Sequence, residues 1–153
     1  DLFLAHYSGN LPGSSAPYPG VEDALNRLEA AGYRFAVCTN KFEDMSRRLL
    51  QGLGIAGRFD AICGQDTFPY RKPDPRHLLS TIEAAGGDPA KAVMIGDSET
   101  DIITAKAAGI PVVAVDFGYT DRHVREFEPS CVISHFDALT LDLVDGLLKA
   151  AAR

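Results

Sequence analysis

The stretch that decides the fold is Val93-Met94-Ile95-Gly96-Asp97-Ser98-Glu99-Thr100-Asp101, and a segment with helical periodicity follows it at once. A short apolar run that ends in a glycine and carboxylates is typical of a buried parallel strand, which delivers polar groups to its carboxyl end. Asp97 lies at the tip of this predicted strand and Asp101 about one helical turn further on. Two carboxylates this close repel each other unless a cation lies nearby, and Mg²⁺ shared with a phosphate suits such a pair.

The same residues have a purely structural interpretation. Ser98 can cap the N-terminus of the following helix, with Asp101 as its acidic partner three residues later, as in a capping box. Asp97 would then simply lie at the positive end of the helix dipole. This stretch alone leaves helix capping and metal chemistry equally open, so the rest of the chain has to decide between them.

Apolar strands and amphipathic helices alternate along most of the chain. Strands are expected at 33–38, 59–63, 92–95, 112–115 and 131–133, and helices at 21–31, 42–52, from Asp74 onward, at 102–108 and, capped by Asp137, near the C-terminus. The strands are continuous apolar runs, which predicts an α/β fold with a parallel sheet covered by helices on both faces. Residues 1–11 resemble the end of a helix that stops at Gly9, and a linker rich in Pro, Gly and Ser follows.

Length and charge limit the classes of function. The 153 residues suffice for one domain with a core, and 46% of them are hydrophobic. The formal net charge of −6 and the lack of a basic stripe argue against a nucleic-acid partner. No apolar run approaches the roughly 20 residues of a membrane span, and the N-terminus does not resemble a signal peptide. Small phosphorylated molecules remain possible partners, since they need only a few local positive groups.

Cysteine and histidine usage indicates neither disulfides nor a histidine metal site. An odd number of cysteines beside predicted strands favours buried free thiols in a reducing cytoplasm over a redox role. The histidines are scattered without ligand spacing and are interpreted as structural or surface groups. These residues are Cys38, Cys63 and Cys131, and His6, His77, His123 and His135.

Two further strand ends carry candidate chemistry. Thr39 and Asn40 follow the first strand, where a hydroxyl, an amide and backbone N–H groups at a helix start can cradle an oxyanion, although such residues are more often simple N-caps. Lys72 lies in a polar loop before Pro73, which restricts its backbone, although an exposed loop lysine is usually only solvated. An anion cradle, a cation and an acidic pair at successive strand ends together suggest a phosphorylated small molecule, a divalent metal and phosphoryl transfer.

Three motifs in this order resemble the second, third and fourth motifs of the haloacid dehalogenase (HAD) superfamily, and the resemblance covers the chain from Tyr18 onward. They are Val37-Cys38-Thr39-Asn40-Lys41, Arg71-Lys72-Pro73-Asp74-Pro75 and Ile95-Gly96-Asp97-Ser98-Glu99-Thr100-Asp101. Further segments resemble the phosphoglycolate-phosphatase-like branch of the superfamily: Tyr18-Pro19-Gly20-Val21, Gly64-Gln65-Asp66-Thr67, Ala107-Ala108-Gly109 and Phe117-Gly118-Tyr119.

The resemblance implies a role for each matching residue. Thr39 and the backbone at Asn40 would hold the transferring phosphoryl group, and Lys72 would stabilise the nucleophile and the phosphate. Asp97 would bind Mg²⁺, and Asp101 would support the metal site or orient Lys72. The implied fold is a HAD-like Rossmannoid parallel sheet.

The first motif of that superfamily, Asp-x-Asp-x-Thr, does not occur here. Its first aspartate is the nucleophile that forms an aspartyl-phosphate, and its second is the general acid/base. Asp1 is followed by Leu-Phe-Leu, and residues 1–20 contain no strand that ends in carboxylates. We therefore expect residues 1–17 to be a remnant of the cap return segment and a linker, and residues 18–153 to form an incomplete core. A truncated product is the simplest explanation, and a genuine half-site protein is the other.

The missing motif predicts a missing central strand. The sheet would then have a gap between the strands ending at Cys38 and Ile95, pair them directly, or be filled by another chain through exposed strand edges, as in a homo-oligomer. The expected function is Mg²⁺-dependent hydrolysis of a phosphate monoester, 2-phosphoglycolate first, with this chain inactive alone. The alternatives are another HAD phosphatase or phosphomutase acting on a sugar phosphate, nucleotide or pyrophosphate, or a non-catalytic phosphate-binding module.

Overall fold

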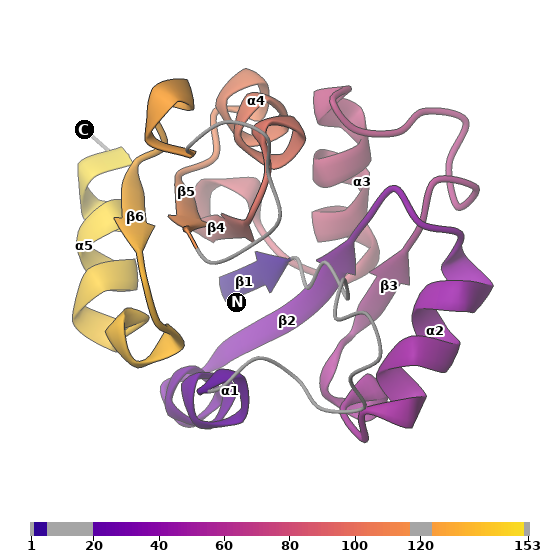
Figure 1. The fold of residues 1–153 in the computed structure, drawn as a ribbon, viewed down its shortest axis with the longest axis horizontal. Helices are drawn as coiled ribbons and strands as arrows, with labels where there is room; N and C mark the ends of the chain where they lie inside the picture. Colours follow the sequence, from indigo (N-terminus) through magenta and orange to yellow (C-terminus); the bar gives the residue numbers. More distant parts are fainter. Residues whose placement is uncertain (1, 6–19, 117–123, 152–153) are drawn as a thin grey trace.

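The computed structural model describes residues 2–5, 20–116 and 124–151, and its centre is a six-stranded parallel sheet. The strand order is β3-β2-β1-β4-β5-β6, and each neighbouring pair runs in parallel. Figure 1 shows helices around this sheet, so the predicted α/β fold is confirmed. The strands are β1 (Leu2–Ala5), β2 (Tyr33–Cys38), β3 (Ala61–Cys63), β4 (Ala92–Gly96), β5 (Val112–Val115) and β6 (Cys131–Ile133).

The first four α-helices connect successive strands and the fifth follows the last strand; local sequence signals set their ends. Asp74 caps α3, because its carboxylate accepts a hydrogen bond from the Arg76 backbone N–H at 2.9 Å and Pro75 occupies the first helical position. In the part of the chain that the structure describes, every helix is too short or too polar to cross a bilayer. The helices are α1 (Val21–Ala30), α2 (Glu43–Gly52), α3 (Pro75–Ala84), α4 (Glu99–Ala108) and α5 (Leu141–Ala151), with short 3₁₀ helices η1 (Ala56–Arg58), η2 (Pro89–Lys91), η3 (Val124–Phe127) and η4 (Phe136–Ala138).

Each face of the sheet has its own buried core. Along β2, Phe35 and Val37 pack with α1 and α5 on one face, whereas Ala36 and Cys38 pack with α3 and α4 on the other. The same alternation holds along β4 and β5. Because both faces are covered, the strands are continuous apolar runs, as the sequence indicates. Parallel strands also bring all their carboxyl ends to one edge, where the loops after β2, β3 and β4 meet.

The centre of the sheet differs from the prediction, because this chain's own β1 occupies it. Leu2 lies opposite Tyr33 of β2 and Phe3 opposite Ala92 of β4, both in parallel register. The expected gap, direct pairing or foreign strand is therefore wrong, and so is the expected helix for residues 2–5; its expected end at Gly9 lies outside the described residues. The physical reason is that the inner edges of β2 and β4 carry backbone groups that need partners, which an apolar extended segment supplies and a helix does not.

Other boundaries differ in smaller ways. The third strand begins at Ala61 instead of 59, and the helix expected at 102–108 already begins at Glu99. Asp137 does not cap the last helix, because a short 3₁₀ helix intervenes; the Thr140 hydroxyl accepts a hydrogen bond from the Leu143 N–H at 3.2 Å instead. The expected linker, the boundary at residue 17 and the expected loop beyond Asp116 fall largely on residues 6–19 and 117–123, outside the described residues.

We predict that Leu4→Pro will disrupt the fold through β1. Proline removes a backbone N–H in the middle of a strand that is paired on both sides, and this should expose the inner edges of β2 and β4. The expected result is a thermal midpoint lowered by about 5–10 °C or more, with self-association in analytical ultracentrifugation. Leu4→Val, which keeps the N–H and the strand propensity, is the matched control. An unchanged midpoint and a monomeric Leu4→Pro protein would show that residues 2–5 do not hold the sheet together.

Candidate functional site

A buried ion pair lies where the loops after β2, β3 and β4 meet. The Lys72 ammonium donates to Asp101 Oδ1 at 2.5 Å, and the two side chains are only 3% and 1% exposed. Burial by itself would lower the pKa of Lys72, but the charge of Asp101 and the hydrogen bond to it outweigh burial, and the pKa is raised above its usual value. Lys72 is therefore a buried cation held against Asp101, and the simple solvated-loop interpretation does not apply.

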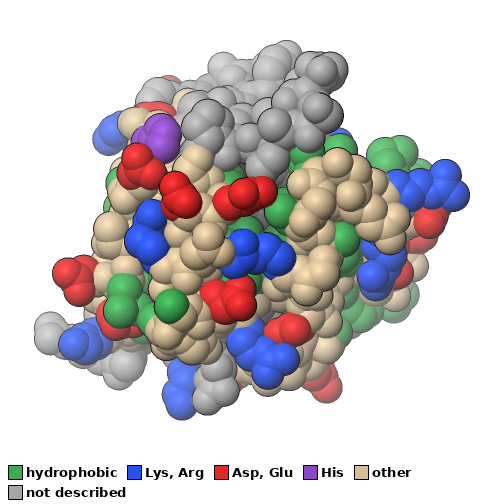
Figure 2. Space-filling model, turned by 90° about the horizontal axis from the view of Figure 1, so that it is seen from below, with side chains coloured by type: hydrophobic (Ala, Val, Ile, Leu, Met, Phe, Trp, Pro, Cys, Tyr) green, Lys and Arg blue, Asp and Glu red, His purple; other side chains and the backbone are tan. Residues whose placement is uncertain are grey.

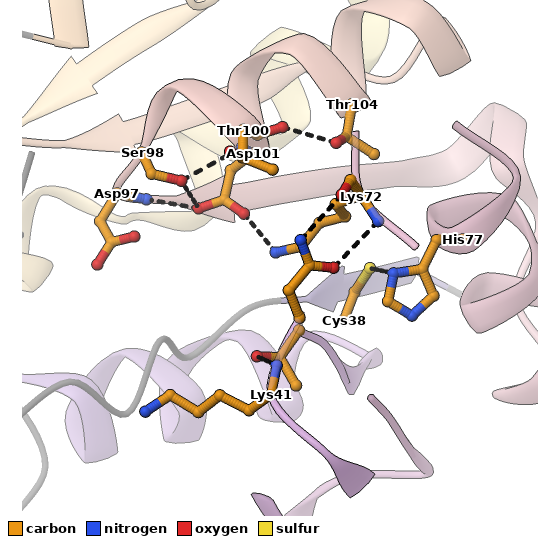
Figure 3. Close-up of polar contacts among 11 residues, drawn as sticks. Cys38, Lys41, Lys72, His77, Asp97, Ser98, Thr100, Asp101 and Thr104 are labelled. Carbon is orange, nitrogen blue, oxygen red and sulfur yellow. Dashed lines mark hydrogen bonds and ion pairs between the residues drawn. The ribbon is translucent and has the colours of Figure 1, made fainter. Parts of the chain in front are cut away.

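Asp101 is held in place by the start of its own helix. Its Oδ2 accepts hydrogen bonds from the Asp97 backbone N–H at 3.0 Å and from the Ser98 hydroxyl at 3.1 Å, while Ser98 caps α4. Both carboxylate oxygens thus have donors. Asp101 thus belongs to the helix cap, as the structural interpretation expects, and it also forms the ion pair with Lys72 (Figure 3).

Gly96 makes room for this arrangement at the end of β4. A Cβ atom at this position would lie 2.4 Å from the Asp101 Cβ and 2.8 Å from its Cγ, closer than real side chains approach. The glycine of the opening motif is therefore required because the Asp101 side chain folds back against the strand end.

Asn40 clamps the loop that carries Lys72. Its side-chain Nδ2 donates to the Lys72 carbonyl at 2.9 Å, and its Oδ1 accepts from the Lys72 backbone N–H at 3.1 Å. The amide therefore pairs with both backbone polar groups of one residue. In this structure the Asn40 side chain contacts the lysine loop, which leaves its backbone as the part that can contact a phosphoryl group.

Thr39 is buried at the end of β2. Its backbone N–H donates to the Cys63 carbonyl at 3.0 Å, and its hydroxyl oxygen accepts from the Lys41 N–H at 3.1 Å. A hydroxyl that accepts one hydrogen bond still carries a hydrogen to donate. Thr39 can thus serve the local turn and a phosphate oxygen at the same time.

Asp97 lies at the tip of β4 and is 7% exposed. Figure 3 shows its carboxylate turned away from that of Asp101. Within residues 2–5, 20–116 and 124–151, no three His, Cys, Asp or Glu side chains gather into a metal-binding group. Mg²⁺ commonly uses one or two protein carboxylates and takes its other ligands from water and phosphate, so Asp97 fits as a single protein ligand. Asp101 does not, because its oxygens accept from Lys72, Asp97 and Ser98.

The structure brings the predicted residues together and shows two features that the sequence did not reveal, the side-chain clamp of Asn40 and the clearance at Gly96. Asp97 follows β4 and Thr39 follows β2 at one edge of the sheet, and Lys72 is linked to both loops through Asp101 and Asn40. The Asn40 clamp joins segments that lie far apart in the sequence, so no local pattern reveals it. The clearance at Gly96 involves Asp101 of the same motif, and the glycine itself was its visible signal. Figure 2 shows one face of the molecule with acidic and basic side chains intermixed, so Lys72 differs from these surface charges in being buried.

Comparisons with known proteins identify relatives of this chain. The family model for haloacid dehalogenase-like hydrolases matches residues 2–115. A phosphoglycolate phosphatase of Mesorhizobium japonicum is 67% identical over 150 residues, which are 98% of this chain and 66% of that protein. One of Agrobacterium fabrum is 48% identical over 99% of this chain and 65% of its own length. The chain thus spans just under two thirds of the length of these curated relatives.

Solved structures show the same fold. A predicted phosphoglycolate phosphatase from Haemophilus somnus superposes with a TM-score of 0.75 at 30% identity, over 84% of this chain and 56% of that one. The structure of CbbY from Rhodobacter sphaeroides in complex with phosphate gives a TM-score of 0.74 at 26% identity, over 85% of this chain and 59% of that one.

We predict that Lys72→Met will strongly destabilise the protein. It leaves the Asp101 carboxylate buried without its cation, which typically costs about 3–5 kcal/mol in the free energy of unfolding. Lys72→Met with Asp101→Leu should cost less than Lys72→Met alone, because no unpaired charge remains. Urea denaturation measures both values.

The matched control is the exposed pair of Arg48 and Asp44, whose side chains are 78% and 76% exposed. Arg48→Met should change the unfolding free energy by less than about 1 kcal/mol. Equal losses of unfolding free energy in Arg48→Met and Lys72→Met would show that the buried pair contributes no more to stability than an exposed pair.

Proposed function

Since the chain belongs to the haloacid dehalogenase-like hydrolase family, we propose that it carries the phosphate-binding part of a Mg²⁺-dependent phosphate monoester hydrolase that acts on 2-phosphoglycolate. The observation that carries this proposal is the buried Lys72–Asp101 pair, clamped by Asn40 beside Thr39 and Asp97. The substrate is supported by relatives named phosphoglycolate phosphatase at up to 67% identity in this comparison.

In this proposal each residue acts on a phosphoryl group at the carboxyl edge of the sheet. Thr39 donates its hydroxyl hydrogen to a phosphoryl oxygen, and backbone N–H groups of the loop after it contribute further donors. Lys72 supplies a fixed positive charge that balances the charge developing on the phosphoryl oxygens during transfer. Asp97 holds the metal, and Asp101 keeps the ammonium of Lys72 in place. When bound, Mg²⁺ would act as a Lewis acid on the phosphate oxygens.

Under the same proposal, residues 1–20 lack the Asp-x-Asp motif that would supply the nucleophile. Residues 6–10, which follow β1, read His-Tyr-Ser-Gly-Asn, and no Asp-x-Asp pattern occurs in residues 1–20. The residues after β1 therefore include no carboxylate that could attack phosphorus and become an aspartyl-phosphate. We infer that the chain alone binds phosphate and Mg²⁺ without turnover, and that an Asp-x-Asp strand in its place would complete the site.

The second candidate is a phosphate-binding module without catalysis, since the Lys72–Asp101 pair and the Thr39 hydroxyl can hold a phosphate without turnover. The two candidate functions predict different rates of hydrolysis when an Asp-x-Asp motif is supplied. A cytoplasmic location fits either candidate, because the cysteines Cys38, Cys63 and Cys131 are free thiols.

Hydrolysis of 2-phosphoglycolate distinguishes the two candidates. The chain itself should release phosphate at the background rate in the presence of Mg²⁺. A chimera that joins it to the part of the Mesorhizobium japonicum relative not covered by the match should hydrolyse the substrate, at least about a thousandfold faster than the chain alone. Robust turnover by the chain alone would mean that it contains a nucleophile after all, and an inactive but folded chimera would favour the binding module.

Two variants of the chimera test the assigned roles. Asp97→Asn removes the proposed metal ligand and should lower kcat/KM by about 10²-fold or more, as does loss of a strong electrostatic group at an active site. Asp116→Asn is the matched control, because Asp116 follows the neighbouring strand β5 and bonds to the Ser134 hydroxyl. It should leave kcat/KM within about twofold. Similar losses in both variants would contradict the role assigned to Asp97.

A further inference from the structure

A fully buried histidine lies beside the end of β2, next to the loop that begins at Thr39 (the Thr39 loop). His77 belongs to the first turn of α3 and is 0% exposed. Its Nε2 lies 3.1 Å from the Gly64 carbonyl oxygen, and its Nδ1 lies 3.8 Å from the Cys38 sulfur. Figure 3 shows the ring facing Cys38, the residue immediately before Thr39. One imidazole thus contacts the ends of both β2 and β3.

The partners determine where the proton lies on the ring. A carbonyl oxygen can only accept a hydrogen bond, so Nε2 must carry a hydrogen and donate it to Gly64. In a neutral ring Nδ1 is then an acceptor, and the Cys38 thiol is the group positioned to donate to it. The competing arrangement is a thiolate–imidazolium pair, in which both ring nitrogens carry hydrogens.

Charge and burial favour the neutral pair. Burial, helped by the nearby positive charge of Lys72, lowers the pKa of His77 to about 4, although the Gly64 carbonyl and Asp74 favour the charged form. Burial likewise raises the pKa of the Cys38 thiol to about 11, against the opposing effect of Lys72. An imidazolium and a thiolate at this position would therefore both be disfavoured at neutral pH.

The backbone at Gly64, which His77 contacts, lies against the loop that follows Thr39. A Cβ atom at Gly64 would lie 2.4 Å from the Lys41 carbonyl oxygen and from the Glu43 nitrogen, so the two backbones touch. The Gln65 N–H donates to the Lys41 carbonyl at 2.9 Å, and the Thr39 N–H donates to the Cys63 carbonyl at 3.0 Å. Displacing Gly64 would therefore displace the segment that follows Thr39.

We propose that neutral His77, with its proton on Nε2, is a positioning residue that ties the ends of β2 and β3 together behind the Thr39 loop. The tie also anchors the start of α3, which follows the loop of Lys72. The functional role of this contact rests on the proposed function, because a phosphate site needs Thr39 and Lys72 at fixed positions. The contact itself does not depend on that proposal, so it can be tested without any substrate.

Nitrogen NMR of the uniformly ¹⁵N-labelled chain at pH 7 reads the protonation state of the ring directly. Nε2 should appear as a protonated nitrogen and Nδ1 as an unprotonated one. Cys38→Ala should shift the Nδ1 resonance and leave Nε2 protonated. A proton on Nδ1 alone, or on both nitrogens, would overturn the proposal; the second outcome would assign the thiolate–imidazolium pair instead.

Native-state hydrogen exchange tests whether the contact positions the loops. His77→Ala should accelerate exchange of the Thr39 and Gln65 amides by about tenfold relative to the Met94 amide, because a buried hydrogen bond is lost. His77→Gln places an amide donor near the Gly64 carbonyl and should restore exchange to within about threefold of the parent. Ile82→Val, in the same helix and also 0% exposed, is the control for general loss of stability.

The outcomes separate the tie from the proposed function. Equal acceleration of all three amides in His77→Ala, as expected for Ile82→Val, would reduce His77 to an ordinary core residue and overturn the proposal. Should His77→Ala fail to fold, the protonation state of the ring in the parent chain decides, because a hydrogen on Nδ1 alone leaves no donor for the Gly64 carbonyl. A confirmed tautomer and selective exchange in a chain that does not bind inorganic phosphate would support the tie and contradict the proposed function.

Discussion

The Lys72–Asp101 ion pair is the constraint on which the rest of the site depends. Two charges buried at 3% and 1% exposure are tolerated only if each is paired and hydrogen-bonded. Asp101 meets this condition through Lys72, Ser98 and the backbone of Asp97. Lys72 can reach it only if its loop crosses from the end of β3 to the end of β4, and the Asn40 clamp fixes that crossing. The parallel sheet makes the arrangement possible by bringing these strand ends to one edge.

The pair has a chemical consequence as well as a structural one. An ammonium held by a buried carboxylate is pre-organised, so it needs no reorganisation when negative charge develops beside it. The pairing also separates the roles of the two aspartates. Asp101 is committed to the lysine, whereas Asp97, with its carboxylate turned away, is the one suited to a cation. His77 is a comparable constraint made by uncharged groups, since its ring contacts Cys38 at the end of β2 and Gly64 after β3 and, in our proposal, holds the two loops that follow.

Sequence patterns predicted the parts of this site that depend on local chemistry. Continuous apolar runs predicted the parallel strands, and the expectation that the acidic strand end and the Lys72 loop lie at one edge of the sheet is confirmed. Contacts between distant segments have no such local signal. Nothing in the sequence around Asn40 shows that its amide pairs with the Lys72 backbone, and a lone histidine in a helix does not reveal a carbonyl and a thiol on either side. β1 was missed for a related reason: four residues at the chain start acquire strand structure only through two neighbours far along the sequence.

The proposed function requires that the residues at the carboxyl edge of the sheet form a single phosphate site. A titration of the ¹⁵N-labelled chain with inorganic phosphate and Mg²⁺, followed by backbone amide shifts, tests it most directly. The account predicts saturable shifts that centre on Thr39, Asn40, Lys72 and Asp97. Shifts that centre instead on the cavity at the opposite edge, lined by Arg34 and Arg58, or no saturable shifts at all, would contradict it.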